Sequence, residues 1–183
     1  MYRMINDSIV SIANKYLGKE EIQPNKGFKD PEFQKQMQSV GWYSGASWCA
    51  YLGILVWTEA YTPYPDILKH AQKLFSGNSQ QMANNFHSDP TWPTSINVPQ
   101  VGSLCVWGEG DSTTSGHTGI VIAVNPDGVG FKTIEGNTVK DTDILKGNER
   151  EGYIVATHNH ITNKPHSVTG LNLIRFIHPV IPQ

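Results

Sequence analysis

The chain has 183 residues, of which 38% are hydrophobic and 16% are charged, with a formal net charge of −2 and a pI near 6.4. This composition excludes a disordered chain, no apolar run is long enough to span a bilayer, and a nucleic-acid-binding protein would show a basic patch that is missing here. We therefore expect one domain over residues 1–183, which has no membrane-spanning segment and does not bind nucleic acid.

The N-terminal part of the chain predicts helical structure without an export signal. Residues 1–8 lack the unbroken apolar run of a secretory signal peptide. Residues 5–17 place apolar side chains at helical spacing and Gly18 follows as a C-cap, which predicts an amphipathic helix. After a loop that contains proline and glycine, residues 31–40 can form a second short helix.

An almost wholly apolar stretch from Ser47 to Trp57 predicts a buried helix of about three turns. Ser44 or Ser47 could cap it, which would place Cys49 in its first turn. Unpaired backbone N–H groups and the helix dipole favour a thiolate there, so Cys49 is a candidate nucleophile. The alternative is that Cys49 is a small buried hydrophobe, because free cysteines are among the most buried residues.

The segments on either side of this helix are less regular. The preceding loop, residues 41–46, carries Trp42 and Tyr43, which could face a substrate or fill the core. Residues 66–75 show helical spacing, and the polar segment 76–99 has room for one more short helix before a long loop.

The second half of the chain predicts a β-sheet. Strands are expected over residues 103–108, 117–124, 129–135, 153–156 and 171–177, with loops over residues 108–116 and 139–150. Cys105 lies in the first strand, without a helix start or a basic neighbour, so we expect a packed and unreactive thiol. Both cysteines are expected to be free, since a disulfide between them would consume the candidate nucleophile.

A turn sequence, Asn125-Pro126-Asp127-Gly128, joins the second and third strands into an antiparallel hairpin. Pairing across this turn sets His117 opposite Glu135, so the two side chains could be neighbours. Asn137 has the same alternation as Glu135 and could face the same cleft if the strand continues that far. Alternatively, residues 135–138 could form an ordinary turn.

These polar residues meet the needs of a cysteine nucleophile. Such a nucleophile requires a histidine to take and return a proton, and a third polar group to hold the imidazole. Cys49 and His117, with either Glu135 or Asn137, provide this set.

Three histidines near the C-terminus suggest a second kind of site. His158 and His160 stand at strand spacing on one face with His166 nearby, a pattern able to bind a divalent metal. No carboxylate or cysteine lies close to them in sequence, so we predict no metal and no cofactor.

Five short segments are individually weak signals, but their joint order and spacing is fairly specific. They are Tyr16-Leu17-Gly18 with Glu20 or Glu21, Trp48-Cys49-Ala50, Pro99-Gln100-Val101-Gly102, Gly116-His117-Thr118-Gly119-Ile120-Val121 and Ile134-Glu135-Gly136-Asn137-Thr138. Together they resemble the CHAP amidase/peptidase domains of the NlpC/P60 superfamily of bacterial and phage cell-wall hydrolases. One departure is Ser103, where that family often has Asp after its Pro-x-x-Gly, a position that shapes a turn.

The resemblance implies an α+β, papain-like fold with N-terminal helices packed on an antiparallel β-sheet of about five strands. It implies that Cys49 is the nucleophile, His117 the base, and Glu135 and Asn137 the polar partners. The implied substrate is peptidoglycan, cleaved through a thioester acyl-enzyme at the N-acetylmuramoyl-L-alanine bond or within a stem peptide or cross-bridge. A delivery or immunity protein could be a further partner.

Two other functions fit the same residues. One is an acyl-transfer enzyme that acts on another amide, and the other is a non-catalytic binding domain on the same fold, which the complete set of polar residues argues against. A bacteriolytic enzyme without an export signal would act after lysis, after delivery by a secretion system, or after removal of a leader.

Overall fold

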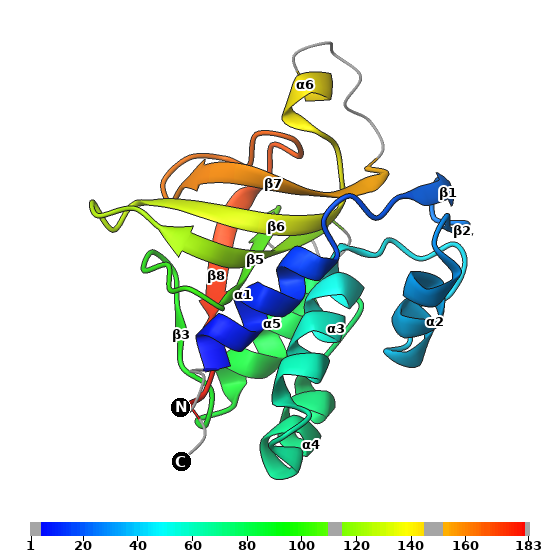
Figure 1. The fold of residues 1–183 in the computed structure, drawn as a ribbon. Helices are drawn as coiled ribbons and strands as arrows, with labels where there is room; N and C mark the ends of the chain where they lie inside the picture. Colours follow the sequence, from blue (N-terminus) through cyan, green and yellow to red (C-terminus); the bar gives the residue numbers. More distant parts are fainter. Residues whose placement is uncertain (1–4, 110–114, 145–151, 182–183) are drawn as a thin grey trace.

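The computed structural model describes residues 5–109, 115–144 and 152–181 (Figure 1). The helices are α1 (Ile5–Lys15), α2 (Pro31–Ser39), α3 (Cys49–Tyr61), α4 (Pro65–Leu74), α5 (Ser79–Ser88) and α6 (Asp141–Ile144). The strands are β1 (Glu21–Gln23), β2 (Gly27–Phe28), β3 (Thr94–Ser95), β4 (Leu104–Gly108), β5 (Gly116–Val124), β6 (Gly130–Thr138), β7 (Ile154–Ile161) and β8 (Asn172–Ile177). The loops expected over residues 108–116 and 139–150 lie partly outside the described residues, as does the start of the N-terminal segment 1–8.

The main sheet is antiparallel, with the strand order β3-β8-β4-β5-β6-β7, and β1 and β2 form a separate hairpin. Helices α1, α3 and α5 pack on this sheet (Figure 1). The predicted α+β class, with N-terminal helices on an antiparallel sheet, is therefore confirmed. The sheet has six strands because the two-residue β3 pairs with β8. That strand lies in the polar segment 76–99, where the sequence has no alternating pattern.

Helix α3 is the central helix of the fold, and ten of its 13 residues are buried. It begins at Cys49 itself, so the N-cap position falls on Trp48, which makes no side-chain capping hydrogen bond. The predicted cap by Ser44 or Ser47 is therefore wrong. The physical reason is that the Trp48 indole is buried and its Nε1 donates to Glu21 Oε2 at 3.0 Å, which anchors the start of the helix from the side.

The predicted hairpin is formed by β5 and β6, but its register differs from the expected one. Glu135 pairs with Gly119 rather than with His117, and the ladder shifts between Val121 and Ala123. Since residues two apart on a strand point to the same face, His117 and Glu135 still project on one side of the sheet.

Apolar side chains form two clusters, one on each face of the sheet. The larger cluster joins the helices to the sheet, and the smaller contains Cys105, Trp107, Val121, Phe131 and Phe176. Cys105 is completely buried there, as predicted. His117 pairs with Trp107 across the ladder, so it projects on the side of the smaller cluster.

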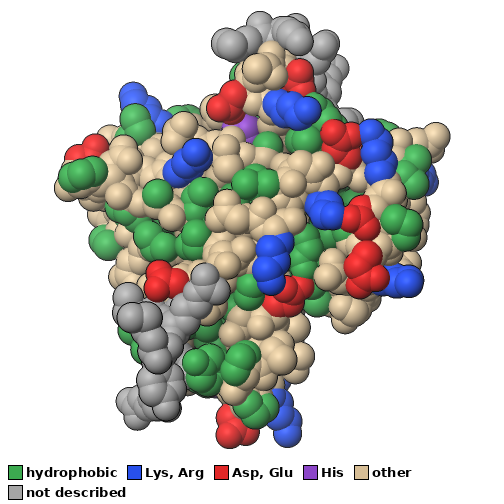
Figure 2. Space-filling view, in the orientation of Figure 1, with side chains coloured by type: hydrophobic (Ala, Val, Ile, Leu, Met, Phe, Trp, Pro, Cys, Tyr) green, Lys and Arg blue, Asp and Glu red, His purple; other side chains and the backbone are tan. Residues whose placement is uncertain are grey.

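The surface shows no charge segregation on the face drawn in Figure 2, where described acidic and basic side chains are interspersed. Among the described residues, no helix combines the length and apolar character that a membrane crossing requires.

Candidate active site

A cleft of about 460 Å³ opens at the start of α3. Its wall consists of Tyr43, Ala46, Ser47, Cys49, Tyr51, Ser76, Gly77, Asn78, Ser79 and Gly116. Of the two aromatic residues that could have faced a substrate, Tyr43 lines the cleft and is 65% exposed. Trp42 is buried instead, and its Nε1 donates to the backbone oxygen of Ala46.

Cys49 lies in the wall of this cleft with only 6% of its surface exposed. Burial by itself raises the pKa of a thiol, but the charge and hydrogen bond of His117 act in the opposite direction. The backbone N–H of Thr118 and the hydroxyl of Ser79 also favour the thiolate, so the pKa of Cys49 falls below its ordinary value. Cys105 is the opposite case, since burial and the nearby Glu135 carboxylate raise the pKa of its thiol well above the usual range.

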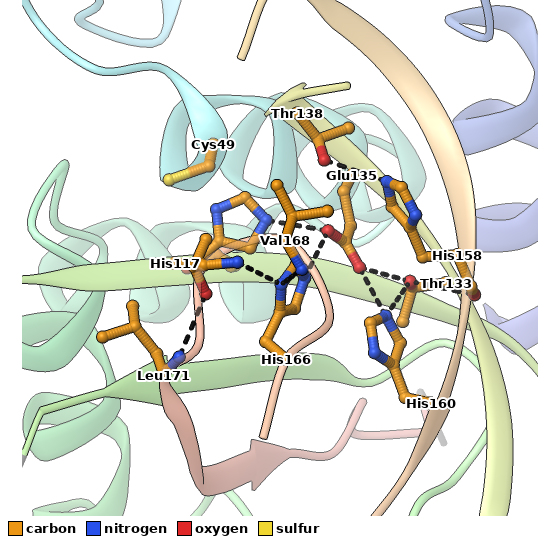
Figure 3. Close-up of polar contacts among 12 residues, drawn as sticks. Cys49, His117, Thr133, Glu135, Thr138, His158, His160, His166, Val168 and Leu171 are labelled. Carbon is orange, nitrogen blue, oxygen red and sulfur yellow. Dashed lines mark hydrogen bonds and ion pairs between the residues drawn. The ribbon is translucent and has the colours of Figure 1, made fainter. Parts of the chain in front are cut away.

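His117 lies at the start of β5, beside Cys49, and is buried (Figure 3). Its Nε2 donates to Glu135 Oε2 at 2.8 Å, which leaves Nδ1 for Cys49. Burial lowers the pKa of the imidazole, but attraction and hydrogen bonds to Cys49 and Glu135 outweigh it and raise the pKa to about 10. Each group therefore stabilises the charged form of the other, a thiolate on Cys49 and an imidazolium on His117.

Glu135 has no exposed surface, and its carboxylate accepts four hydrogen bonds (Figure 3). His117 and His166 both donate to Oε2 at 2.8 Å, while His160 and Thr133 donate to Oε1 at 2.7 and 2.5 Å. Burial raises the pKa of this carboxyl, but the favourable electrostatics and hydrogen bonds of the surrounding imidazoles hold it well below the usual range. Glu135 is thus an anion at neutral pH.

Asn137 is placed differently from the prediction. The ladder between β6 and β7 shifts between Glu135 and Thr138, and Asn137 has a positive φ of 53°. The strand alternation that would have put Asn137 beside Glu135 therefore ends before it. Its side-chain Oδ1 is buried without a hydrogen-bond partner among the described residues. The structure brings Cys49, His117 and Glu135 together, with Asn137 just beyond them.

The three C-terminal histidines are all buried, and each has a carboxylate partner that is distant in sequence. His160 and His166 bond Glu135, whereas the Nδ1 of His158 lies 2.7 Å from Asp141 Oδ1. His117, Glu135 and His166 also bring potential metal-ligand atoms within 4.8 Å of one another. Sequence reasoning missed this arrangement because it looked for carboxylates only near the histidines in the chain.

Sequence reasoning also missed Ser79, the first residue of α5. Its Oγ lies 3.9 Å from Cys49 Sγ and accepts a hydrogen bond of 2.8 Å from Thr118 Oγ1. Because Thr118 supplies the proton in that bond, the hydroxyl hydrogen of Ser79 is available for the sulfur. The sequence offered one hint of this contact. Thr118 follows His117 directly, so its polar side chain points to the opposite face of the strand, where a polar partner such as Ser79 is needed.

The CHAP domain family model matches residues 35–137, which is more than half of the chain. The matched segment contains Cys49, His117, Glu135 and Asn137, and it ends before His160 and His166. None of the curated protein sequences is significantly similar to the chain.

One solved structure, described as "The crystal structure of Ly7917", matches with 14% sequence identity and a TM-score of 0.49. The alignment covers 95% of this chain and 62% of that one, so the chain spans less than two thirds of the length of the solved chain.

Proposed function

The chain belongs to the CHAP domain family, and we propose that it is a peptidoglycan amidase or peptidase that cleaves an amide bond with Cys49 as the nucleophile. The observation that supports the proposal is the chain of contacts from a cleft-lining thiol to a buried imidazole and then to a buried carboxylate. This is the set of groups that covalent acyl transfer requires.

In the first half of the reaction, the Cys49 thiolate attacks the carbonyl carbon and the π electrons move to the carbonyl oxygen. When the tetrahedral intermediate collapses, the C–N bond breaks and the His117 imidazolium gives its proton to the leaving amine. The product is a thioester on Cys49. In the second half, neutral His117 takes a proton from water, the resulting hydroxide attacks the thioester, and the thiolate leaves.

Two donors are suited to stabilise the oxyanion that forms in each half. The first is the backbone N–H of Cys49, which lies in the first turn of α3, where N–H groups have no partner within the helix. The second is the hydroxyl of Ser79, which Thr118 orients. Glu135 holds the imidazole of His117 and stabilises its positive charge.

The substrate bond in this proposal is N-acetylmuramoyl-L-alanine or an amide within a stem peptide or cross-bridge. The protein would reach a cell-wall substrate after lysis, through a secretion system or after removal of a leader, with a delivery or immunity protein as an accompanying partner. An acyl-transfer enzyme with another amide substrate would use the same groups, whereas a binding domain would not need a thiolate.

Digestion of purified peptidoglycan sacculi tests the proposal. Mass analysis of the soluble fragments should show stem peptides with a free L-alanine amine for an amidase, or opened peptides for an endopeptidase. Cys49→Ala should lower the rate by about 10⁴-fold or more without unfolding the protein, while Cys105→Ala stays near the wild-type rate. Equal fragment release by wild type and Cys49→Ala would refute the proposal, and loss of the fold in Cys49→Ala would mark Cys49 as a core residue.

A further inference from the structure

His166 lies in the connection between β7 and β8, outside the segment that the family model matches. Within residues 162–171 it is the one buried residue, because the rest of this connection is exposed or half-buried. Its side chain has no exposed surface and reaches Glu135 Oε2 at 2.8 Å. Its ring centroid lies 4.7 Å from that of Trp107 and 4.8 Å from that of His117. The side chain of His166 therefore extends from an exposed loop into the buried site around Glu135.

The hydrogen bonds of His166 determine where its proton lies. Its Nδ1 accepts from the backbone N–H of Val168 at 3.2 Å (Figure 3) and from the backbone N–H of Thr169 at 3.1 Å. A nitrogen that accepts two N–H groups cannot carry a proton of its own. The neutral ring therefore has its proton on Nε2, which is the atom that faces Glu135.

The buried position of His166 favours this neutral form. Burial lowers the pKa of its imidazole, and the neighbouring His117 and His160 act in the same direction, although Glu135 opposes them. Among the described residues, His158 is a further titratable neighbour, with a ring centroid 6.1 Å away. A second imidazolium on the same carboxylate oxygen as His117 would repel the positive charge that His117 carries.

We propose that His166 is a positioning residue of the site, a neutral N–H donor that holds Glu135 Oε2 against His117 Nε2. Glu135 Oε2 has two histidine donors, and His166 is the one that does not exchange a proton during the reaction. Without it, the carboxylate could turn toward His160 and Thr133, whose donors lie on Oε1. The role in turnover rests on the proposed function, whereas the protonation state and the effect on Cys49 do not.

The same atoms could be read as a metal site, since His117, Glu135 and His166 come within ligand range of one another. A metal would need the lone pair of His166 Nε2, but the backbone donors at Nδ1 place the ring proton on that nitrogen. The hydrogen-bond pattern therefore favours a proton donor over a ligand.

The test compares His166→Phe with His166→Gln, in a Cys105→Ala background that leaves one thiol. Phe removes the donor and keeps a ring, whereas the Gln amide can still donate to Glu135. We expect His166→Phe to lower kcat/KM by roughly 10- to 100-fold, the usual effect of losing an outer hydrogen-bond partner. His166→Gln should recover most of that loss. His87→Phe, a matched change at an exposed histidine of α5, should behave as wild type.

A second readout separates positioning from mere packing. The rate of Cys49 alkylation by iodoacetamide, measured against pH, follows the thiolate. His166→Phe should move its midpoint upward by roughly one pH unit, because His117 loses part of its carboxylate partner and attracts the thiolate less. Loss of packing alone would lower the melting temperature without this shift. A folded His166→Phe with an unchanged alkylation profile would overturn the proposal.

If His166→Phe does not fold, the wild-type protein still decides the matter. ¹⁵N NMR of labelled histidine should find His166 neutral at pH 7, with its proton on Nε2. A proton on Nδ1, an imidazolium, or a stoichiometric Zn²⁺ site in calorimetry would overturn the assignment. Inactivity toward sacculi beside these expected NMR and alkylation results would refute the proposed function alone.

Discussion

At Glu135, one buried carboxylate influences the charge of two other groups. Cys49 is the larger cause of the raised pKa of His117, and Glu135 raises it further, while the imidazolium of His117 in turn lowers the pKa of Cys49. Because the coupling runs through a single oxygen, a change that keeps the shape of Glu135 but removes its charge is the most direct probe of the site.

Glu135→Gln should lower kcat/KM by roughly 10²-fold and narrow the pH–rate profile from both sides. Without the carboxylate, the pKa of His117 falls from about 10, which moves the alkaline limb to lower pH. The weaker imidazolium stabilises the thiolate less, so the pKa of Cys49 rises and the acidic limb moves to higher pH. The measurement is kcat/KM against pH.

Asn137→Ala is the companion variant, since an amide adds no charge to the pair. We expect Asn137→Ala to lower kcat/KM while leaving the acidic and alkaline limbs of the pH–rate profile nearly unchanged. If Glu135→Gln keeps the wild-type rate and profile while Asn137→Ala is crippled, Asn137 is the third member and the interpretation of Glu135 is wrong.

Ser79 provides a second prediction at the scale of one residue. Ser79→Ala removes a hydroxyl that faces the sulfur, and loss of an oxyanion donor typically costs about 10²-fold in kcat. We expect a fall of roughly 10- to 100-fold in kcat with little change in KM. Thr118→Val should act in the same direction but less strongly, because it only disorients Ser79. Ser88→Ala, at the exposed far end of α5, is the control. A change confined to KM would assign Ser79 to substrate binding instead.

Among the elements, β6 meets α3 at a point with no spare space. A Cβ on Gly136 would lie 2.7 Å from Cζ3 of Trp48 and 3.0 Å from Cδ2 of Leu52. Both side chains are buried, so neither can move away freely. The contact sets the distance between the strand that carries Glu135 and the helix that carries Cys49.

Gly136→Ala should therefore destabilise the fold by about 1–3 kcal/mol, the usual cost of overpacking, and should also lower activity by displacing Trp48. Urea unfolding measures the first effect and sacculus digestion the second. Gly53→Ala is the comparison within α3, since its new Cβ would lie 3.0 Å from Cδ2 of the buried Leu104, a milder overlap than the 2.7 Å contact with Trp48, and the change gains helix propensity. A Gly136→Ala protein as stable as wild type would show that the strand and helix can separate.

The hairpin shows how far sequence reasoning reached at this scale. The turn at residues 125–128 was sufficient to predict the pairing of β5 with β6 and the proximity of His117 to Glu135. The register could not be predicted, because the shift between Val121 and Ala123 has no signature in these β-branched and small residues. The contact survived since a displacement of two residues preserves the face of a strand.

The missing parts of the predicted site come from loops and helix starts. His166 reaches Glu135 through a loop conformation that depends on backbone bonds at Val168 and Thr169. Ser79 meets Cys49 only because α5 packs beside α3 on the sheet. Hydrophobic periodicity in the sequence indicates which residues share a face of one helix or strand. It could not predict contacts that depend on how separate elements pack together.

For the whole molecule, the strand order makes the C-terminal region part of the central structure. β8 lies between β3 and β4, and β7 borders β6, although both follow the segment that the family model matches. One large apolar cluster also joins residues from the N-terminal helices to residues of β8. That residues 1–183 form a single domain remains a prediction, and this connectivity supports it.

A single domain should unfold in one cooperative step. Calorimetry should show one transition whose van't Hoff and calorimetric enthalpies agree, at about 130 kcal/mol near 60 °C for a chain of 183 residues. Near-UV circular dichroism and Cys49 alkylation should follow the same curve. Two separate transitions would divide the chain into independent units.

Cys49 belongs to the helical layer and His117 to the sheet, so the acidity of this thiol depends on the docking of the two layers. A chain with both layers formed but not yet docked would have an ordinary, slowly reacting cysteine at neutral pH. Brief pulses of an alkylating agent during refolding would therefore time the docking event, with Cys49 becoming more reactive as the protein folds. The reactivity of Cys105 would fall during refolding, since its burial in the sheet makes its thiol inert. The alkylation of the two thiols would therefore report on two separate stages of folding.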